Sequence, residues 1–380
     1  MSQRLTYRSS WLRRALAVAT ALGLVALLSA CGGSSGGTTS GSSSSASSQK
    51  ATVAFLLPEN LTYRWENQDA PYFKAALQQL DPNVNVLVDN AGADASTQQS
   101  QAEAALANGA KVLIVAPVDS AAAAVIVNDA KQAGVPVIAY DRLITNAPLN
   151  YYVSFDGFRV GQLQGQYVAQ NTPKGGTVVI INGSQTDNNA VLFHNGYMSV
   201  LQPLFNNGTL KKGYESWTPN WDPANAQREM EQALTVLHNN VQAVLSANDG
   251  MATTIIAALQ AQGLAGKVVV TGQDATVAGL QRILEGTQSM TVYKPLKAEA
   301  SAAAQITAAL LKGENPVTAL ASLFNGKTVN NGMVQVPSVL LQPETVTKSN
   351  IESTVIKDGF VTQQALCQGI PAADCPTPGY

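Results

Sequence analysis

Polar side chains of a few types, together with two tryptophans, recur where short apolar stretches of the sequence end. In chain order they are Arg64, Trp65, Asp141, Arg142, Asn188, Asn189, Trp221, Asn248, Asp274 and Lys294. Carboxylate and amide oxygens accept hydrogen bonds from hydroxyl groups, and guanidinium, ammonium and amide groups donate to them. An indole laid against a face of C–H groups adds buried apolar area and excludes water. This combination suits a small polyhydroxylated ring such as an aldose.

The same residue types also have ordinary structural roles. Asp and Asn after a strand commonly cap the next helix or form a turn, so Asp187 and Asn248 can be caps. Arg142 and Lys294 can be solvated surface charges. The recurrence of such residues at nearly every predicted strand end, with Trp at two of them, favours a binding site.

The sequence offers no reactive constellation of an enzyme, since its match to the hydrolase pattern G-x-S-x-G at 32–36 lies in the Gly/Ser-rich tether. It contains no HExxH, no P-loop and no G-x-G-x-x-G after a predicted strand. Asp141 and Asp274 could face each other as a glycosidase pair, but the donors around them favour hydrogen bonds to ligand hydroxyls. We therefore expect a binding protein with no catalytic residue, cofactor or metal.

The elements that position these residues alternate between strand-like and helix-like. Apolar stretches rich in β-branched residues lie at 52–57, 84–88, 112–116, 135–140, 177–182, 241–247 and 267–272. Amphipathic stretches of helical length lie at 98–108, 121–133, 161–170, 224–237, 253–262 and 277–285. The alternation predicts an α/β fold with parallel sheets covered on both faces. Because the pattern restarts after Tyr152, we expect two doubly wound domains, with a ligand in the crevice at the carboxyl ends of the strands.

The N-terminal segment has the pattern of an export signal. Four arginines within the first 14 residues precede an apolar stretch at 15–28, which is short for a membrane span. The sequence Leu28-Ser29-Ala30-Cys31 resembles the lipobox of bacterial lipoproteins, in which the peptide is cut before the Cys and the thiol is acylated. Gly, Ser and Thr dominate residues 32–49, as in a flexible tether. We expect a lipoprotein signal peptide at 1–30 and a lipidated Cys31 with its tether at 31–49.

Cys367 and Cys375 lie eight residues apart near the C-terminus. An exported protein occupies an oxidising compartment, so we expect them to form a disulfide. A metal-binding pair is the weaker interpretation, because no His lies nearby.

The composition argues against a nucleic-acid partner. The net charge is −2 and only 13% of the residues are charged, so the chain has no basic footprint for nucleic acid. A sugar-controlled repressor would need an N-terminal helix-turn-helix, where this chain has an export signal and a tether.

From about residue 53 to 359 the chain resembles the D-xylose-binding protein family, periplasmic sugar receptors of the ribose/galactose-binding type. The resemblance rests on the segments Arg64-Trp65, Ala139-Tyr-Asp-Arg142, Val153-Ser-Phe-Asp156, Asp187-Asn-Asn-Ala190, Ser246-Ala-Asn-Asp249, Thr271-Gly-Gln-Asp-Ala275, Thr291-Val-Tyr-Lys-Pro295 and Thr354-Val-Ile-Lys-Asp-Gly359. Their order along some 300 residues makes the match specific.

The resemblance implies a role for each candidate residue. From the first domain, Arg64 and Arg142 would donate hydrogen bonds to the sugar and Asp141 would accept them from it, with Trp65 stacked on one face. From the second domain it would contact Asn188 or Asn189, Asn248, Asp274 and Lys294, with Trp221 stacked on the other face. The alignment leaves the choice between the two adjacent Asn residues open.

The expected organisation is that of a type I periplasmic binding protein with a three-crossover hinge. We expect an N-terminal lobe at 50–154 plus 295–335, a C-terminal lobe at 155–294 plus 336–362, and a Cys-containing tail at 363–380. The crossovers are expected near 153–157, 290–295 and 336–341, and a bound sugar would favour the closed lobes.

The resemblance implies a monomer that delivers an aldose, most simply D-xylose, to an ABC permease and its ATPase. It would be exported and held by its lipid at the outer face of the cell membrane, or lie in the periplasm. Segments 151–167 and 198–203 look closer to a branch that accepts glucose, galactose and arabinose. A broader aldose receptor that also feeds chemotaxis or sensing is therefore the alternative, and a sugar-active enzyme is a weaker one.

Overall fold

Strands and helices alternate along residues 50–376, the part of the chain that this computed structural model describes. The strands are β1 (Thr52–Leu57), β2 (Asn85–Asn90), β3 (Leu113–Val115), β4 (Val137–Tyr140), β5 (Tyr151–Phe155), β6 (Thr177–Asn182), β7 (Lys211–Trp217), β8 (Ala243–Ser246), β9 (Val269–Val270), β10 (Thr291–Tyr293), β11 (Thr328–Asn330), β12 (Gln335–Leu341) and β13 (Glu344–Val346). The α-helices are α1 (Ala70–Leu80), α2 (Ala95–Ala107), α3 (Ala124–Gln132), α4 (Gly157–Asn171), α5 (Asn188–Asn206), α6 (Pro223–Val236), α7 (Asp249–Ala261), α8 (Val277–Leu284), α9 (Leu296–Leu311), α10 (Pro316–Ala319), α11 (Ala321–Phe324) and α12 (Gln363–Cys367). Three further helical segments are η1 (Trp65–Asp69), η2 (Pro219–Trp221) and η3 (Glu352–Ile356).

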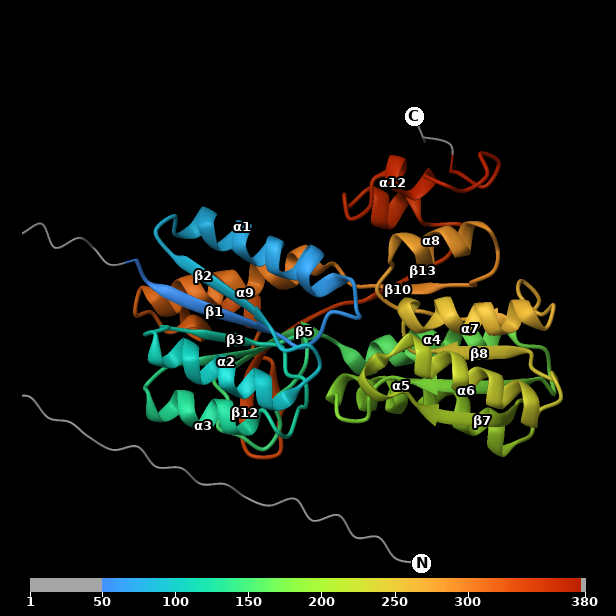
Figure 1. The fold of residues 1–380 in the computed structure, drawn as a ribbon, viewed down its shortest axis with the longest axis horizontal. Coiled ribbons are helices and arrows are strands. Elements are labelled where there is room, and N and C mark those ends of the chain that lie inside the picture. The colour runs from blue at the N-terminus through green and yellow to red at the C-terminus, as the bar shows by residue number, and fades with distance from the viewer. Residues whose placement is uncertain (1–49, 377–380) are drawn as a thin grey trace, which may run out of the picture. The chain divides into compact units, whose positions relative to one another are not determined.

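Seven strands form one sheet in the order β11-β12-β5-β4-β3-β1-β2, and we call this half of the structure lobe 1. Neighbouring strands are parallel except β11, which runs antiparallel to β12. Helices α1 and α9 lie on one side of the sheet, and α2 and α3 lie on the other (Figure 1). The sheet is therefore the covered, parallel kind that the strand–helix alternation predicts.

The residues of β1 explain why both faces need cover. Val53, Phe55 and Leu57 pack in one core with residues of α1 and α9, whereas Ala54 and Leu56 pack in a second core with residues of α2 and α3. Successive side chains of a strand point to opposite faces, so an unbroken apolar stretch fills both cores. All five side chains are fully buried.

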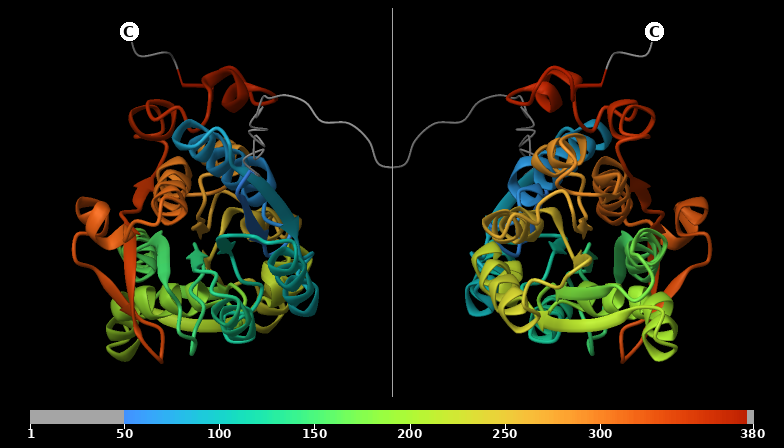
Figure 2. Two further views of the ribbon diagram at one scale, coloured as in Figure 1. Left: turned by 90° about the vertical axis from the view of Figure 1, so that its left-hand side faces the viewer. Right: turned by 90° about the vertical axis from the view of Figure 1, so that its right-hand side faces the viewer.

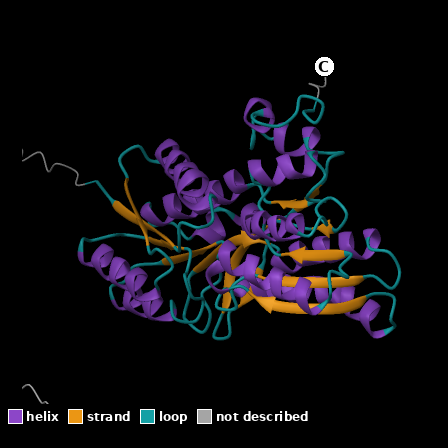
Figure 3. Cartoon of the chain, turned by 45° about the vertical axis from the view of Figure 1, so that its right-hand side comes forward, coloured by secondary structure: helices purple, strands orange, loops and turns teal. Residues whose placement is uncertain are grey.

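Lobe 2 contains a four-stranded parallel sheet in the order β7-β6-β8-β9 and a separate antiparallel pair, β10 and β13. Helices surround both groups of strands (Figure 3). Helices α4 and α5 approach closely because Gly161 has no side chain: a Cβ there would lie 2.0 Å from the carbonyl oxygen of Phe193. This close packing holds the start of α5, which reaches the candidate site.

The chain passes between the lobes three times, between β5 and α4, between β10 and α9, and between β12 and β13. The last crossover differs from the sequence-based boundary, which assigned 336–341 to lobe 2. Strand β12 instead pairs in parallel with β5 in the lobe 1 sheet, with Ser338 opposite Tyr152. The apolar pattern of a strand does not specify which of two sheets it joins, so the boundary belongs after Leu341.

The C-terminal segment packs on lobe 2 rather than standing apart from it. Cys367 and Cys375 form a disulfide with their Cα atoms 5.4 Å apart. Gln281 of α8 donates hydrogen bonds to the carbonyl oxygens of Leu366 and Gln368. Both end-on views place this segment, in red, at the outer edge of the molecule (Figure 2).

The predicted signal peptide, the lipidation site Cys31 and the tether lie outside the described residues. Among residues 50–376, no helix combines the length and the apolar character that crossing a membrane requires.

Candidate ligand-binding site

A cavity between the lobes lies at the carboxyl ends of strands from both sheets. Its space amounts to about 20 Å³, room for about one water molecule, so a sugar ring enters only if side chains or lobes move apart. The side chains around it are Thr62, Arg64, Trp65, Asp141, Arg142, Asp187, Asn189, Phe193, Trp221, Asn248, Gln273, Asp274 and Lys294.

The structure brings nine of the ten sequence-predicted ligand residues to this cavity. The exception is Asn188, the first residue of α5, which is half-buried and whose backbone N–H donates to the Ser120 hydroxyl at 3.0 Å. Of the two adjacent Asn residues that the sequence left open, Asn189 is the one that faces the cavity.

Four lining residues were missed in the sequence: Thr62, Asp187, Phe193 and Gln273. The position of Asp187 in the sequence predicts a helix cap, and its place in the same segment as Asn189 is the signal that links it to the cavity. Phe193 lies one helical turn after Asn189, so helical periodicity places both on one face. Gln273 precedes Asp274 directly and carries a buried side-chain oxygen without a partner.

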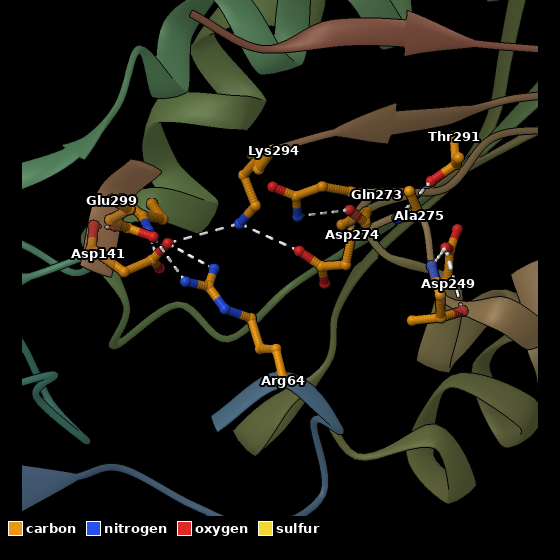
Figure 4. A network of polar contacts seen from close by, with 12 residues as sticks. Arg64, Asp141, Asp249, Gln273, Asp274, Ala275, Thr291, Lys294 and Glu299 are labelled. Carbon is orange, nitrogen blue, oxygen red and sulfur yellow. Dashed lines mark hydrogen bonds and ion pairs between the residues drawn. The ribbon is translucent and has the colours of Figure 1, made fainter. Parts of the chain in front are cut away.

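Arg64 is the centre of a buried ion network in lobe 1. Its guanidinium donates to Asp69 at 2.7 Å, to Asp141 at 2.6 Å and to Glu299 at 2.8 Å. Figure 4 shows Arg64 reaching toward Asp141 and Glu299. The three carboxylates fix the orientation of the planar guanidinium, because each of its three nitrogens donates to at least one of them. Burial raises the pKa of Glu299 well above its ordinary value, and the charge of Asp141 raises it further.

Asp141 follows β4 in a left-handed backbone conformation, with φ of 58°. Its carbonyl oxygen accepts hydrogen bonds from the hydroxyls of Tyr152 at 3.0 Å and Ser154 at 2.6 Å, which hold this turn. Burial alone would raise the pKa of the Asp141 carboxyl, but the cations Arg64, Lys294 and Arg142 together lower it to about 2. The carboxylate is therefore ionised and fixed in position.

Several polar contacts cross between the lobes at the cavity. The Lys294 amine of lobe 2 lies 3.5 Å from Asp141 of lobe 1, and within lobe 2 it lies 3.1 Å from Asp274 (Figure 4). The Asn189 amide donates to the Asp141 carboxylate at 2.9 Å. Arg142 donates to Asp187, the cap of α5, at 2.9 Å. A hydroxyl both donates and accepts, so a ligand hydroxyl between these groups can bond to a carboxylate of one lobe and to an amine or amide of the other.

Trp221 packs over a residue that must be glycine. A Cβ on Gly183 would lie 2.1 Å from the Trp221 ring carbon Cη2, so only glycine leaves room for the indole. The ring nitrogen donates to Asp187 at 3.1 Å, and Phe193 packs against the ring edge-on at 6.3 Å between centroids. Trp221 has φ of 57°, a costly conformation for an aromatic residue that the surrounding contacts must maintain.

Trp65 is held by polar partners on its edge and its face. The ring nitrogen donates to Glu59 at 2.6 Å. The guanidinium carbons of Arg64 and Arg142 lie 4.5 Å and 5.1 Å from the ring centroid, within the range of cation–π attraction. The indole therefore orients two cations of the site in addition to offering apolar surface.

Asp141 and Asp274 are poorly suited to act as a glycosidase pair. A general acid needs a carboxyl with a raised pKa, whereas the pKa of Asp141 is lowered to about 2. Lys294 also lies between Asp141 and Asp274. Among the described residues, no group of His, Cys, Asp and Glu side chains has the arrangement of a metal site.

The chain matches known proteins over most of its length. The family described as periplasmic binding protein domain matches residues 53–315. The D-xylose-binding periplasmic protein of Escherichia coli K12 is 42% identical over 303 residues, which cover 80% of this chain and 88% of that protein. The multiple sugar-binding periplasmic protein SbpA of Azospirillum brasilense is 36% identical over 335 residues. The match covers 83% of this chain and 90% of that protein.

A solved structure extends the comparison to the fold. The carbohydrate transporter solute binding protein of Chloroflexus aurantiacus, in complex with D-glucose, is 32% identical with a TM-score of 0.76, covering 83% of this chain and 98% of that one. This similarity confirms the predicted fold class. The chain therefore belongs to the periplasmic binding protein family, among the relatives of the D-xylose-binding periplasmic proteins.

Proposed function

We propose that this chain captures one aldose, D-xylose, in the cavity between its lobes and presents it to an ABC importer. The observation that carries the proposal is the set of buried hydrogen-bonding groups from both lobes around one small space, including Arg64, Asp141, Asn189 and Lys294. The D-xylose-binding relatives support the choice of sugar.

Capture proceeds by closure of the lobes around the sugar. The contacts that cross the cavity connect Asp141 with Lys294 and Asn189, and Arg142 with Asp187. Sugar hydroxyls inserted among these groups bond to both lobes at once, so the sugar binds the closed arrangement better than a separated one. That differential affinity is what shifts the population toward closure.

Trp221 and Trp65 give the cavity its apolar surfaces. Trp221 is supported from behind by Gly183 and on its edge by Phe193, so its exposed area is presented in one orientation. We propose that Trp221 stacks on one face of the sugar and Trp65 on the other, with Asn248 and Asp274 bonding to its rim. No step in this mechanism needs a reacting group, and the protein acts as a receptor rather than as an enzyme.

The N-terminal pattern supports export and anchoring at the outer face of the cell membrane. Cleavage before Cys31 and acylation of its thiol would leave residues 32–49 as the tether between the lipid and the first strand. The membrane partners are then an ABC permease and its ATPase, reached by the closed lobes of a monomer.

A broader aldose receptor is the second candidate. Two observations favour it: the D-glucose complex of the Chloroflexus protein and the name of the multiple sugar-binding protein of Azospirillum. Such a receptor could also serve sensing or chemotaxis.

Calorimetric titration of the chain beginning at Lys50 with xylose, arabinose, ribose, glucose and galactose separates the two candidates. Tight one-to-one binding of xylose alone supports the xylose receptor. Comparable binding of several aldoses supports the broader receptor, and binding of none contradicts the proposed function.

A further inference from the structure

A second cavity of about 430 Å³ adjoins the first at the outer edge of the cleft. Thr62, Trp221, Asn248 and Asp274 line both cavities, so the two spaces share part of their walls. The second cavity, which we call the outer cavity, offers much more room than the 20 Å³ of the first.

Lobe 1 contributes to the outer cavity a loop that is anchored in place. The buried carboxylate of Glu59 accepts hydrogen bonds from the backbone N–H groups of Leu61 at 2.6 Å and Thr62 at 2.8 Å. These hydrogen bonds fix the loop. The side chains of Leu61 and Tyr63 on it are 49% and 60% exposed to solvent. Both side chains line the outer cavity, so this loop gives it apolar surface from lobe 1.

Lobe 2 supplies a wall of mixed character. Pro223, Val277 and Ala278 give it apolar surface, and Thr253 and Gln281 give it polar groups. A wall of aliphatic, aromatic and polar side chains matches the chemistry of a sugar ring, which has C–H faces and a hydroxyl rim.

We propose that the outer cavity is a second subsite, which holds the second ring of a short oligosaccharide whose first ring occupies the inner cavity. This inference rests on the proposed function and extends its ligand class from free aldoses to pentose disaccharides. The face of Tyr63 packs on the second ring, and the shared residue Trp221 lies at the junction of the two subsites.

Titration with xylobiose and with xylose tests the proposal. Xylobiose is expected to bind one-to-one, in competition with xylose. Tyr63→Ala should weaken xylobiose about fivefold or more and leave xylose within twofold, because only the second ring contacts the aromatic face. Ala278→Phe, which fills the outer cavity from an exposed position on α8, should weaken xylobiose without affecting xylose. Leu80→Ala, another exposed apolar residue, is the control and should change neither sugar.

The outcomes separate this inference from the function on which it rests. Binding of xylose without binding of xylobiose contradicts the second subsite and leaves the proposed function intact. An equal loss of affinity for both sugars in Tyr63→Ala also contradicts the second subsite. That result would mean that Tyr63 lies at the entrance to a single site that both sugars use. Failure of both sugars to bind contradicts the proposed function, and the inference with it.

Discussion

The amine of Lys294 lies 3.5 Å from a carboxylate oxygen of Asp141, across the junction of the two lobes. Lys294 directly follows β10 of lobe 2, and Asp141 directly follows β4 of lobe 1. The same Asp141 carboxylate is also bound by Arg64 at 2.6 Å and by the Asn189 amide at 2.9 Å. Asp141 is thus the group through which both lobes converge on the cavity.

Replacing Asp141 with Asn should weaken aldose binding by about 2 kcal/mol, close to thirtyfold in Kd. The amide removes a charged acceptor and leaves Arg64 and Lys294 with one fewer anion. Titration calorimetry with xylose measures the effect. Asp89→Asn, at an exposed position on β2, should bind xylose as the unsubstituted chain does. An unchanged Kd in Asp141→Asn would show that this carboxylate does not face the ligand.

Replacing Gly183 with Ala should weaken aldose binding at least tenfold. The added Cβ would lie 2.1 Å from the Trp221 ring, so the indole must leave its position over the cavity. Gly250→Ala is the matched control, because its Cβ would meet no atom closer than 3.6 Å. Tryptophan fluorescence and calorimetric titration measure the two effects. Equal affinity in both variants would exclude a fixed Trp221 as a wall of the site.

Much of the fold and site could be predicted from the sequence. Apolar stretches such as β1 specify covered parallel strands, and parallel strands bring their carboxyl ends to one edge. Residues that follow β4, β8 and β10 line the cavity, among them Arg142, Asn248 and Lys294.

What the sequence did not specify depends on tertiary pairing and on helix geometry. Strand β12 belongs to the lobe 1 sheet because it pairs with β5. The apolar pattern of β12 would be the same in either sheet, so the sequence does not predict this pairing. Thr62 lies on an irregular loop whose path is set by Glu59. Asp187 is both a helix cap and a partner of Trp221 and Arg142, and a sequence motif reveals only the first role.

Replacing Trp221 with Ala should weaken binding by about 2 kcal/mol, because the stacking area is lost. Trp217→Ala is the aromatic control, since Trp217 packs beside His194 and does not line the cavity. Competition titration against xylose compares the variants. A larger loss in Trp217→Ala than in Trp221→Ala would contradict the assignment of the stacking face.

The stability of lobe 2 should depend on pH through Asp249. This buried carboxyl accepts hydrogen bonds from Gln288 at 2.7 Å and from the Thr276 N–H at 2.8 Å. Burial raises its pKa to about 6, against the opposing charge of Arg282. A folded pKa above the unfolded value of about 3.9 favours folding when the carboxyl is protonated. That contribution is complete below pH 4 and is lost as the pH rises through 6.

The variant Asp249→Asn lacks this titration. Its stability relative to the unsubstituted chain should therefore rise between pH 4 and pH 7, by on the order of 2–3 kcal/mol for a shift of about two pKa units. Urea unfolding at several pH values measures the difference, with Asp89→Asn as the exposed control. A difference that stays constant with pH would contradict the raised pKa of Asp249.

The central claim is that one sugar is held by both lobes at once, and a crystal structure of the chain with xylose tests it most directly. We expect a pyranose ring against the Trp221 indole, hydrogen-bonded to Asp141 of lobe 1 and to Asn189 and Lys294 of lobe 2. A ring that contacts a single lobe, or that lies away from these residues, would contradict it.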